Sequence, residues 1–401
     1  MSHKILIAGG GIAGMASALA LARTGWQAQV YERAKVFSEV GAGVQLGPNV
    51  TRILQAWGLD HALKQVAAFP TQLQARSTTR GEVLATLALG ADMQRRYGAP
   101  YVTLHRADLH QMLYGAALTA GAQMHSGSVV TAMQNTASHV QVQVTQAELE
   151  TSHLADAAVV ADGVWSQLRQ QLWADGSIQP TGHLAYRTLL RQADLPVHLR
   201  SSDVTVWMGA YAHVVHYPVR EGEWLNLVVL TEGQMPGVTA DDLQSWNAQQ
   251  TPAQTEHDLQ TALRGACAQL QDLIGAASHW RAWPLCGRTP MQGGHQHALG
   301  RVAVLGDAAH PMLPYLAQGA GMAVEDAAVL AQQLSIAVNV PEGLQAFAAQ
   351  RWQRNAHVQH GAIRNGQVFH ARGLLRLGRD LGLRLAGPMF MDQPWLYGAR
   401  V

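Results

Sequence analysis

The start of the chain contains the feature that most restricts how it can fold. An apolar run at residues 5–8 leads into Gly9-x-Gly11-x-x-Gly14, and apolar residues then recur at helical spacing before a second short apolar run ends at Glu32. This order predicts a strand, a helix that begins at the glycines, and a second strand. The chain therefore begins with a βαβ unit and is assigned to the α/β class.

The glycines of this unit favour a bound dinucleotide. Gly9 permits a tight turn, Gly11 lets the backbone approach a pyrophosphate, and Gly14 lets the helix pack closely on the strand. The free N–H groups at the start of the helix attract phosphate. Glu32, at the end of the second strand, is placed to accept hydrogen bonds from a ribose. The alternative is a glycine-rich turn that binds nothing, and the surrounding strand, helix and acidic residue argue against it.

Two further motifs follow apolar runs later in the chain. Asp162-Gly163 comes after one such run, and by itself it also fits a turn that closes a strand. Gly306-Asp307 comes after another run and is followed by Pro311 and a glycine-rich helix start. A carboxylate at the end of a strand can bind a hydroxyl group of a cofactor, and the helix start can present N–H groups to an anionic ring edge.

Composition limits the classes of function. The 401 residues are 48% hydrophobic and 14% charged with a net charge of +1, which fits a globular protein and gives no electrostatic reason to bind nucleic acid. The 19 histidines are scattered without a metal-binding pattern, so no metal site is expected. Two cysteines and the lack of a signal peptide or a run of about 20 apolar residues predict a cytoplasmic protein with no membrane span.

The middle of the chain changes from helical to alternating patterns. Within residues 185–230, sets such as Val204, Val206 and Met208 alternate with polar residues and predict an antiparallel sheet with one buried face. Helical patterns return at residues 240–276 and after residue 320. These patterns predict a split nucleotide-binding domain into which a sheet-rich domain is inserted.

With these motifs in this order, the sequence resembles the class A flavoprotein monooxygenases, which have the para-hydroxybenzoate hydroxylase fold. The resemblance covers almost the whole chain. Segments 41–49 (GAGVQLGPN), 105–109 (HRADL) and 395–398 (WLYG) are similar to the branch of salicylate hydroxylase and 3-hydroxybenzoate 6-hydroxylase. The family implies FAD as cofactor, NADH or NADPH as co-substrate, and hydroxylation of a small aromatic substrate by O2 through a flavin C4a-hydroperoxide.

The resemblance also implies a domain division and a set of cofactor-binding residues. The domains would be a Rossmann-like FAD-binding domain (1–70, 101–180 and 285–340), a substrate domain (71–100 and 181–284) and a C-terminal helical segment (341–401). Gln45 would lie near the flavin ring, Pro311 near its reactive face, and the amides of Ala320 and Gly321 at its pyrimidine edge. The other expected FAD-binding residues are Gly9, Gly11, Ala13, Gly14, Glu32, Arg33, Arg106, Val130, Asp162, Gly306 and Asp307.

The expected substrate pocket is built on one strand. His213 and Tyr217 are four residues apart, so in a strand both side chains lie on the same face. By the resemblance, His213 would accept the phenolic proton, a role that suits a side chain with a pKa near 6.5, and Tyr217 would hydrogen-bond the same oxygen. The alternative is that both are packed on a sheet face, as we expect for His216. Arg187 and Arg76 are candidates to bind a substrate carboxylate.

Some features depart from the family or leave alternatives open. Gly287 replaces an acidic residue that often precedes the arginine equivalent to Arg288, and Gln45 replaces the histidine of 6-hydroxynicotinate 3-monooxygenases, which argues against a hydroxypyridine substrate. A purine, kynurenine or polyketide substrate remains an alternative, as does a flavin-binding module without turnover. Residues 374–384 alternate leucine and arginine at helical spacing, which predicts a packing helix or a homodimer contact, with contact to a membrane surface as the alternative.

Overall fold

The structure is a computed structural model that describes residues 3–37, 43–235 and 250–401. Its nucleotide-binding part is a six-stranded sheet in the order β17-β18-β11-β1-β2-β7. Neighbouring strands from β18 to β7 are parallel, and β17 is antiparallel to β18. The strands are β1 (Lys4–Ala8), β2 (Gln27–Glu32), β7 (Gln123–Ser126), β11 (Ala157–Val160), β17 (Ala298–Leu299) and β18 (Val302–Val304).

The first βαβ unit forms as the sequence predicts. Helix α1 (Ile12–Arg23) begins directly after Gly11, and Gly25 beyond its end adopts a φ of +90°, which suits glycine. Strand β1 is buried on both faces. Ile5 and Ile7 pack against helices, whereas Leu6 packs against a second, small sheet.

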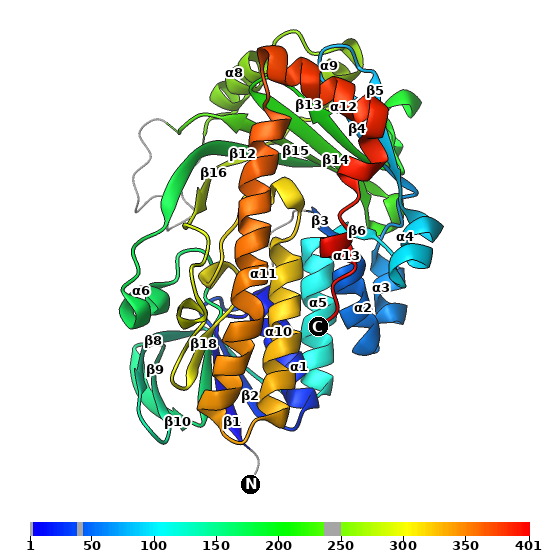
Figure 1. Ribbon diagram of the computed structural model, residues 1–401. Coiled ribbons are helices and arrows are strands. Elements are labelled where there is room, and N and C mark those ends of the chain that lie inside the picture. Colours follow the sequence, from blue (N-terminus) through cyan, green and yellow to red (C-terminus); the bar gives the residue numbers. More distant parts are fainter. Residues whose placement is uncertain (1–2, 38–42, 236–249) are drawn as a thin grey trace.

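Helices cover one face of the six-stranded sheet. Helix α1 packs between α5 (Arg106–Thr119) and α10 (Gly319–Ile336), and the long helix α11 (Val340–Phe369) packs on α10 (Figure 1). The opposite face is covered by an antiparallel sheet of β8 (Ser128–Asn135), β9 (Val140–Gln146) and β10 (Leu149–Ala155). The described helices include none that is both long and apolar enough to cross a membrane.

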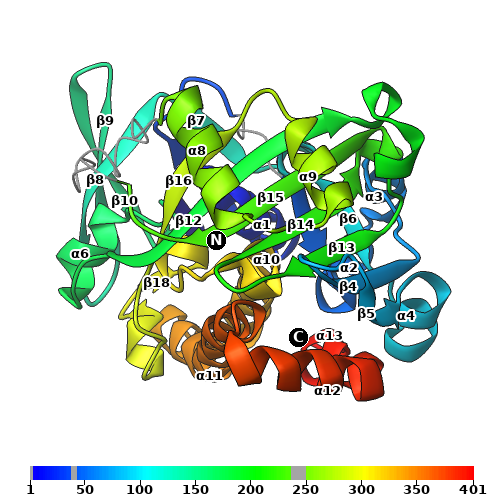
Figure 2. The ribbon, with the colours of Figure 1, turned by 90° about the horizontal axis from the view of Figure 1, so that it is seen from above.

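A seven-stranded sheet lies above the six-stranded sheet in Figure 1, in the order β16-β12-β15-β14-β13-β4-β5. Neighbouring strands are antiparallel except β13 and β4, which are parallel. Helices α8 (Pro252–Ala262) and α9 (Ala268–Gly275) lie on its outer face (Figure 2). The strands are β4 (Gln72–Ser77), β5 (Val83–Ala88), β12 (Gln179–Arg191), β13 (Val204–Met208), β14 (Ala212–Val219), β15 (Trp224–Glu232) and β16 (Arg281–Gly287).

The expectation of one buried face is wrong for the central strands of this sheet. All five residues of β13 and seven of the eight residues of β14 are buried. On one face Trp207 and Val214 pack against α8 and α9, and on the other Tyr217 packs against Met322 of α10. The sheet is therefore enclosed between helices and the nucleotide-binding part.

The remaining elements connect the two large sheets or pack at their edges. Strands β3 (Gly43–Leu46) and β6 (Val102–His105) pair antiparallel beside α2 (Pro48–Ala56). Helix α12 (Gly373–Met391) lies against β5. The expected boundary between residues 284 and 285 falls inside β16, which pairs with β12. The other helices are α3 (Asp60–Val66), α4 (Gly90–Tyr97), α6 (Gln167–Trp173) and α13 (Pro394–Tyr397).

Candidate active site

The motifs found in the sequence lie at the ends of four adjacent strands. Strand β18 leads to Gly306 and Asp307, β11 leads to Asp162, β1 leads to Gly9, and β2 ends at Glu32. Because these strands are parallel neighbours, their carboxyl ends lie at the same edge of the sheet. Ligands of open α/β sheets bind at this edge, so the four motifs form one site.

The glycine turn brings two strands and a helix into backbone contact. Gly9 has a φ of +104°, and a Cβ atom there would lie 2.2 Å from the carbonyl oxygen of Ala161. A Cβ atom at Gly14 would lie 1.9 Å from the carbonyl oxygen of Gly9. Neither position has room for a side chain, so the turn is compact and leaves the N-terminus of α1 facing the site.

Glu32 is fixed beside this turn. Its carboxylate accepts hydrogen bonds from the backbone N–H groups of Gly10 at 2.6 Å and Ala34 at 2.8 Å. His110 of α5 reaches the same turn, with Nε2 2.6 Å from the carbonyl oxygen of Gly10. Arg106 begins α5, and the exposed side chain of Arg33 follows β2.

Asp162 has an unsatisfied oxygen that points to a ligand. Its Oδ1 atom is buried and has no hydrogen-bond partner among the described residues. Burial raises the pKa of this carboxyl, although hydrogen bonds from Ser166 and from backbone N–H groups, and then the charge of Arg33, oppose the shift. Gly163 follows with a φ of +87°, so the chain turns sharply here. A buried oxygen without a partner is costly unless a bound group satisfies it.

The Gly306-Asp307 loop lies against the glycine turn. Gly306 has a φ of +59°, and a Cβ atom there would lie 2.7 Å from Cβ of Ala13 in α1. Asp307 is exposed, and α10 begins nearby at Gly319. The first N–H groups of an 18-residue helix lack partners within the helix, and Ala320 and Gly321 stand in this first turn.

These residues fit FAD. The glycine turn can accept a pyrophosphate, Glu32 and Asp307 can accept hydrogen bonds from ribose and ribityl hydroxyl groups, and Asp162 has an oxygen that lacks a donor. Val130 lies in β8, packed against the core beneath the sheet. The roles of the individual residues stay predictions.

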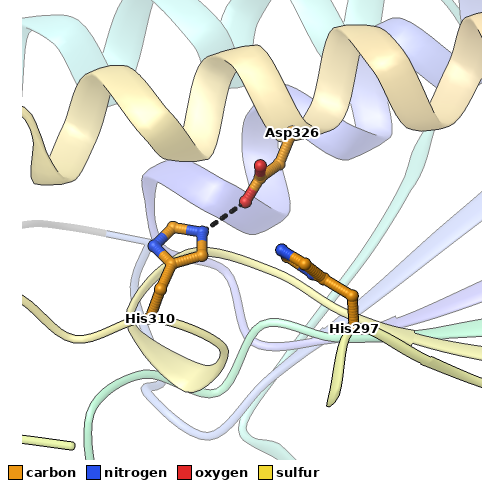
Figure 3. A group of neighbouring side chains, drawn as sticks. All are labelled: His297, His310 and Asp326. Carbon is orange, nitrogen blue, oxygen red and sulfur yellow. Dashed lines mark hydrogen bonds and ion pairs between the residues drawn. The ribbon is translucent and has the colours of Figure 1, made fainter. Parts of the chain in front are cut away.

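A network of buried charged side chains connects the Gly306-Asp307 loop to the helices α10 and α11. His310 Nε2 lies 2.5 Å from Oδ2 of Asp326 on α10 (Figure 3). Arg351 of α11 donates to both Asp326 and Glu325 at 2.8 Å. All of these side chains are almost fully buried. Burial alone would raise the pKa of Asp326, but His310 and Arg351 hold it well below its ordinary value. The network ties the loop to two long helices.

The same cluster has the residue types of a metal site, but its potential ligand atoms already have partners, apart from Nδ1 of His310, which has none among the described residues. Potential ligand atoms of His297, His310 and Asp326 lie within 4.8 Å of one another (Figure 3). His297 Nδ1 lies 2.9 Å from the carbonyl oxygen of Val304, and its Nε2 lies 2.8 Å from the amide nitrogen of Asn355. The guanidinium bound to Asp326 would repel a cation. We interpret the cluster as structural.

One face of β14 is turned toward the cofactor site. The ring of His213 lies 5.0 Å from the ring of Tyr315, which follows the Gly306-Asp307 loop, and Tyr217 packs beside Met322 at the start of α10. Arg187 of β12 is on this face as well, because it pairs with Val228 of β15, which in turn pairs with Val215. Arg187, His213 and Tyr217 therefore share one face.

Arg187 is a partly buried cation that has no counter-ion among the described residues. Its guanidinium lies 4.5 Å over the ring of Trp283, and its Nε atom has no hydrogen-bond partner among the described residues. Burial lowers the pKa of Arg187 to about 10. Within the described ranges no acidic side chain forms an ion pair with it. A desolvated charge of this kind favours an anionic ligand.

Arg76, the other candidate for binding a carboxylate, lies on the opposite face. Its guanidinium stacks 4.6 Å over the ring of Trp207, which packs against α8 and α9. Arg76 and Arg187 are therefore separated by the sheet, and only Arg187 faces the cofactor site.

Gln45 and Tyr217 meet where β3 approaches the large sheet. Tyr101 donates a hydrogen bond to Oε1 of Gln45 at 2.7 Å. A Cβ atom at Gly43 would lie 2.5 Å from the ring of Tyr217, so the strand and the ring are in close contact. Burial raises the pKa of Tyr217 to about 12, although Arg187 opposes the shift. Tyr217 is thus a neutral donor at neutral pH. Gly41 and Ala42, part of the branch segment, lie outside the described residues.

His213 is almost inaccessible and is neutral. It is 1% exposed, and its Nδ1 atom lies 2.8 Å from Nε2 of His370. Burial lowers the pKa of His213 well below 6.5, and His370 and His183 lower it further. Along the strand its Cα atom is about 13 Å from that of Tyr217, so the two side chains approach a ligand from different ends.

Pro311 is buried beside a cavity of about 410 Å³ that is also lined by Arg169 and Arg288. Arg288 has no acidic neighbour in sequence, because Gly287 precedes it, but it pairs with Asp175 at 3.2 Å. Arg169 pairs with the same carboxylate. The acid missing from the sequence motif is therefore replaced from another segment.

Sequence reasoning missed several residues that complete the site. His370 and Arg351 come from α11 or its end, and Tyr315 and Asp326 follow the Gly306-Asp307 loop. His213 and His370 are 157 residues apart, and no local pattern joins them. In the sequence, only the polar residues along α11 indicated such contacts, because polar side chains on a buried helix face need hydrogen-bond partners.

Comparisons with known proteins agree with this site. The family model described as "FAD binding domain" matches residues 2–362. The chain is 33% identical to a 3-hydroxybenzoate 6-hydroxylase of Polaromonas naphthalenivorans, over 99% of this chain and 96% of that protein. It is 36% identical to a 3-amino-4-hydroxybenzoate 2-monooxygenase of Streptomyces platensis, over 98% and 96%. A salicylate hydroxylase substrate complex matches the fold with a TM-score of 0.80 at 23% identity, over 100% and 96% of the two chains.

The match to the family model covers most of the chain, and the similarity to curated hydroxylases covers nearly all of it. The strand-end motifs, the glycine turn and the unsatisfied oxygen of Asp162 agree with FAD as the cofactor. The chain belongs to the FAD-binding-domain family and, within it, to the FAD-dependent aromatic-ring hydroxylases of class A.

Proposed function

We propose that this protein hydroxylates a small phenolic carboxylic acid, a hydroxybenzoate, with NAD(P)H and O2. The observation that carries the proposal is the guanidinium of Arg187, which is partly buried, has no counter-ion among the described residues and lies on the same face as His213 and Tyr217. A substrate carboxylate would supply the missing counter-charge, and the phenol would lie toward the histidine. The names of the relatives agree with this chemistry, since they act on hydroxybenzoates or aminohydroxybenzoates.

Each side chain has a distinct task in this proposal. Arg187 binds and orients the carboxylate. His213 accepts the phenolic proton, since its low pKa keeps it neutral and able to act as a base, and the phenolate then donates electron density to the ring. Tyr217 donates a hydrogen bond to the substrate. Burial on both faces of β14 excludes water from the reacting ring.

The cofactor site completes the proposal. When bound, FAD supplies the reducing and oxygen-transfer chemistry. Gln45 and Pro311 would lie beside the flavin ring, and Ala320 and Gly321 would donate N–H groups to its edge. The remaining FAD-binding residues are those at the strand ends and around them: Gly9, Gly11, Ala13, Gly14, Glu32, Arg33, Arg106, Val130, Asp162, Gly306 and Asp307.

Oxidation of NADH and of NADPH by the purified, FAD-loaded protein tests the proposal. The ligands are 3-hydroxybenzoate, salicylate, 4-hydroxybenzoate and 6-hydroxynicotinate, with 3-hydroxybenzyl alcohol as the matched phenol without a carboxylate. We expect one hydroxybenzoate to stimulate oxidation and the alcohol to fail. Stimulation by the alcohol alone would contradict the role of Arg187. If none of these ligands stimulates oxidation but a purine, kynurenine or polyketide does, the non-phenolic alternative is established. If no ligand of a wide panel stimulates oxidation, the protein is a flavin-binding module without turnover.

A homodimer and a cytoplasmic location are further parts of the proposal. On α12, large apolar side chains face solvent while Arg384 of the same helix pairs with Glu82 at 2.5 Å. A second copy of the chain would cover this apolar surface, since an exposed group of neighbouring apolar side chains often marks an interaction site. The two free cysteines and the use of NAD(P)H fit a reducing compartment. The exposed apolar residues are Leu374, Leu375, Leu377, Leu381, Leu385, Met389 and Phe390.

Light scattering of the purified protein tests the homodimer. We expect a dimer for the unaltered chain and a monomer for Leu381→Glu, because a charge in the centre of an apolar interface is costly. Leu149→Glu, which alters an exposed leucine of the small sheet, is the matched control and should remain dimeric. A monomeric unaltered chain would contradict the proposal.

A further inference from the structure

We propose that His370 and Glu232 form a proton relay that connects the buried His213 to solvent. The inference rests on the proposed function, in which His213 accepts the proton of a phenol. It concerns two residues that belong to different elements: His370 ends α11, and Glu232 ends β15. Neither touches the substrate in this account. Both are positioning residues that act through His213.

The relay is needed because the base is enclosed. His213 is 1% exposed, and burial disfavours its charged form. A proton left on it would place a charge in a site of low polarity, and this cost opposes transfer of the phenolic proton to His213. A route that carries the charge away removes this cost.

The three groups stand in a line from the interior to the surface. His213 Nδ1 lies 2.8 Å from Nε2 of His370. On the other side of the same ring, His370 Nδ1 lies 3.6 Å from Oε1 of Glu232. The exposed fraction of the side chains rises along the line, from a buried His213 through His370 at 3% to Glu232 at 40%.

The carboxylate at the surface sets the proton positions of both rings. Nδ1 of His370 has no hydrogen-bond partner among the described residues, and the carboxylate of Glu232 lies 3.6 Å from it. This negative charge favours the tautomer in which Nδ1 carries the hydrogen and Nε2 is the acceptor. Nδ1 of His213 must then carry a hydrogen and donate it to His370. That leaves Nε2 of His213 with its lone pair free, and no described residue forms a hydrogen bond to it. Glu232, two side chains away, therefore favours the tautomer of His213 that can act as a base.

The proton balance follows from these positions. The phenol O–H bond breaks as a bond forms to Nε2 of His213, and Nδ1 of His213 passes its proton to Nε2 of His370. His370 releases its Nδ1 proton to Glu232, which exchanges it with water after a small side-chain rotation closes the 3.6 Å gap. Reprotonation of the product phenolate runs the same steps backward and restores both rings. No oxidant or reductant takes part.

The other charged and titratable groups around the relay favour proton transfer from His213 toward Glu232. Arg372 pairs with Glu232 and lies 3.6 Å over the ring of Tyr211, which holds the carboxylate at the end of the line. His183 of β12 faces both histidines and lies 2.8 Å from the hydroxyl of Tyr315, so its Nδ1 is occupied. Burial, and then Glu232, raise the pKa of Tyr315, so it stays a neutral donor. The only carboxylate that faces the relay among the described residues is Glu232.

Stopped-flow absorbance on the FAD-loaded enzyme tests the relay. The probe is 3-hydroxy-4-nitrobenzoate, whose phenolate absorbs in the visible range, and ionisation of the bound probe is followed after a jump to higher pH. We expect Glu232→Gln and His370→Gln to slow phenolate formation at least about tenfold, with the binding constant of the probe and the FAD content unchanged. Glu232→Asp should recover most of the rate, since it restores the carboxylate.

Glu223→Gln is the matched control, because this exposed glutamate precedes the other end of β15 and pairs with Arg191. The inference is overturned if Glu232→Gln and His370→Gln ionise the probe at the rate of the unaltered enzyme. If His370→Gln loses FAD, the half-exposed Glu232 variant decides alone. If the unaltered enzyme hydroxylates a hydroxybenzoate and the variants ionise the probe at the same rate as it does, only the relay is contradicted. An unaltered enzyme that neither ionises nor hydroxylates any phenol defeats the proposed function.

Discussion

At the scale of single residues, burial has opposite consequences for the two basic side chains of the substrate face. It lowers the pKa of Arg187 to about 10, which still leaves the guanidinium charged at neutral pH. It lowers the pKa of His213 well below 6.5, which leaves the imidazole neutral. The same desolvation therefore produces one fixed cation for binding and one free base for chemistry.

Replacement of Arg187 tests the first half of this account. We expect Arg187→Gln to lower kcat/KM for a hydroxybenzoate by about 10- to 100-fold, mainly through KM, because a charged hydrogen bond to the carboxylate is worth roughly 1.5–3 kcal/mol. Steady-state kinetics measure the change. Arg76→Gln, on the opposite face of the sheet, is the matched control and should keep its KM. Equal effects of the two variants would refute the assignment.

The pH dependence of kcat/KM tests the second half. A base with a lowered pKa stays deprotonated as the pH falls, so we expect the acidic limb of the profile to lie below pH 6.5. In His213→Gln the limb should disappear together with a loss of hydroxylation of about 100-fold or more. FAD content should be unchanged. An acidic limb above pH 6.5 that persists in the variant would show that another group is the base.

At the scale of elements, the sequence predicted what is locally encoded and missed what distant segments impose. The order β1, α1 and β2 was predicted because glycines and apolar spacing lie within about 30 residues of one another. The two-sided burial of β14 was not, because α8 and α9 cover one face and the segment around Met322 covers the other. Period-2 alternation reveals that a strand has two faces, but not what will later cover the second.

The candidate site shows the same division. The strand-end motifs could be found because each is a short run of residues with a fixed local shape. Arg187 could be named only as one of two candidates, since the face it occupies depends on the register of β12 with β15. His370 could not be found at all, since its partner is 157 residues away.

Contact between α12 and β5 provides a prediction at this scale. A Cβ atom at Gly387 would lie 2.2 Å from Cβ of Ala85, so Gly387→Ala should lower the free energy of unfolding by about 1–3 kcal/mol. Gly378 of the same helix has no atom within 4 Å of such a Cβ, so Gly378→Ala should be neutral or stabilising by up to about 1 kcal/mol. Denaturant unfolding measures both. A loss of stability in Gly378→Ala alone would contradict the packing described for α12.

At the scale of the whole molecule, buried polar groups tie the two sheets and the long helices together. The Asp326–Arg351 network joins α10 and α11 beneath the cofactor loop, and the end of α11 reaches the substrate face through His370. The cofactor loop and the substrate strand therefore share one support. Removal of one member of the network would leave a buried charge unpaired, which is costly.

The buried histidines make stability depend on pH. Burial lowers the pKa of His216, His297 and His370 to about 4. Between about pH 6.5 and 4 the unfolded chain binds protons at these residues and the folded chain does not, so the free energy of unfolding falls as the pH decreases through this window. His216→Phe should reduce that fall by up to about 3 kcal/mol. Denaturant unfolding at several pH values measures it, and an unchanged slope in the variant would show that His216 is not neutral in the folded protein.

The most direct test of the central claim is the mass of the product formed from 3-hydroxybenzoate, NADH and ¹⁸O2 by the FAD-loaded protein. The account predicts a dihydroxybenzoate that carries one ¹⁸O atom, formed about 10- to 100-fold more slowly when Arg187 is replaced by glutamine and the substrate concentration is well below KM. Consumption of NADH without labelled product, for every hydroxybenzoate tried, would contradict the claim that the buried face of β14 is built to hydroxylate a phenolic carboxylic acid.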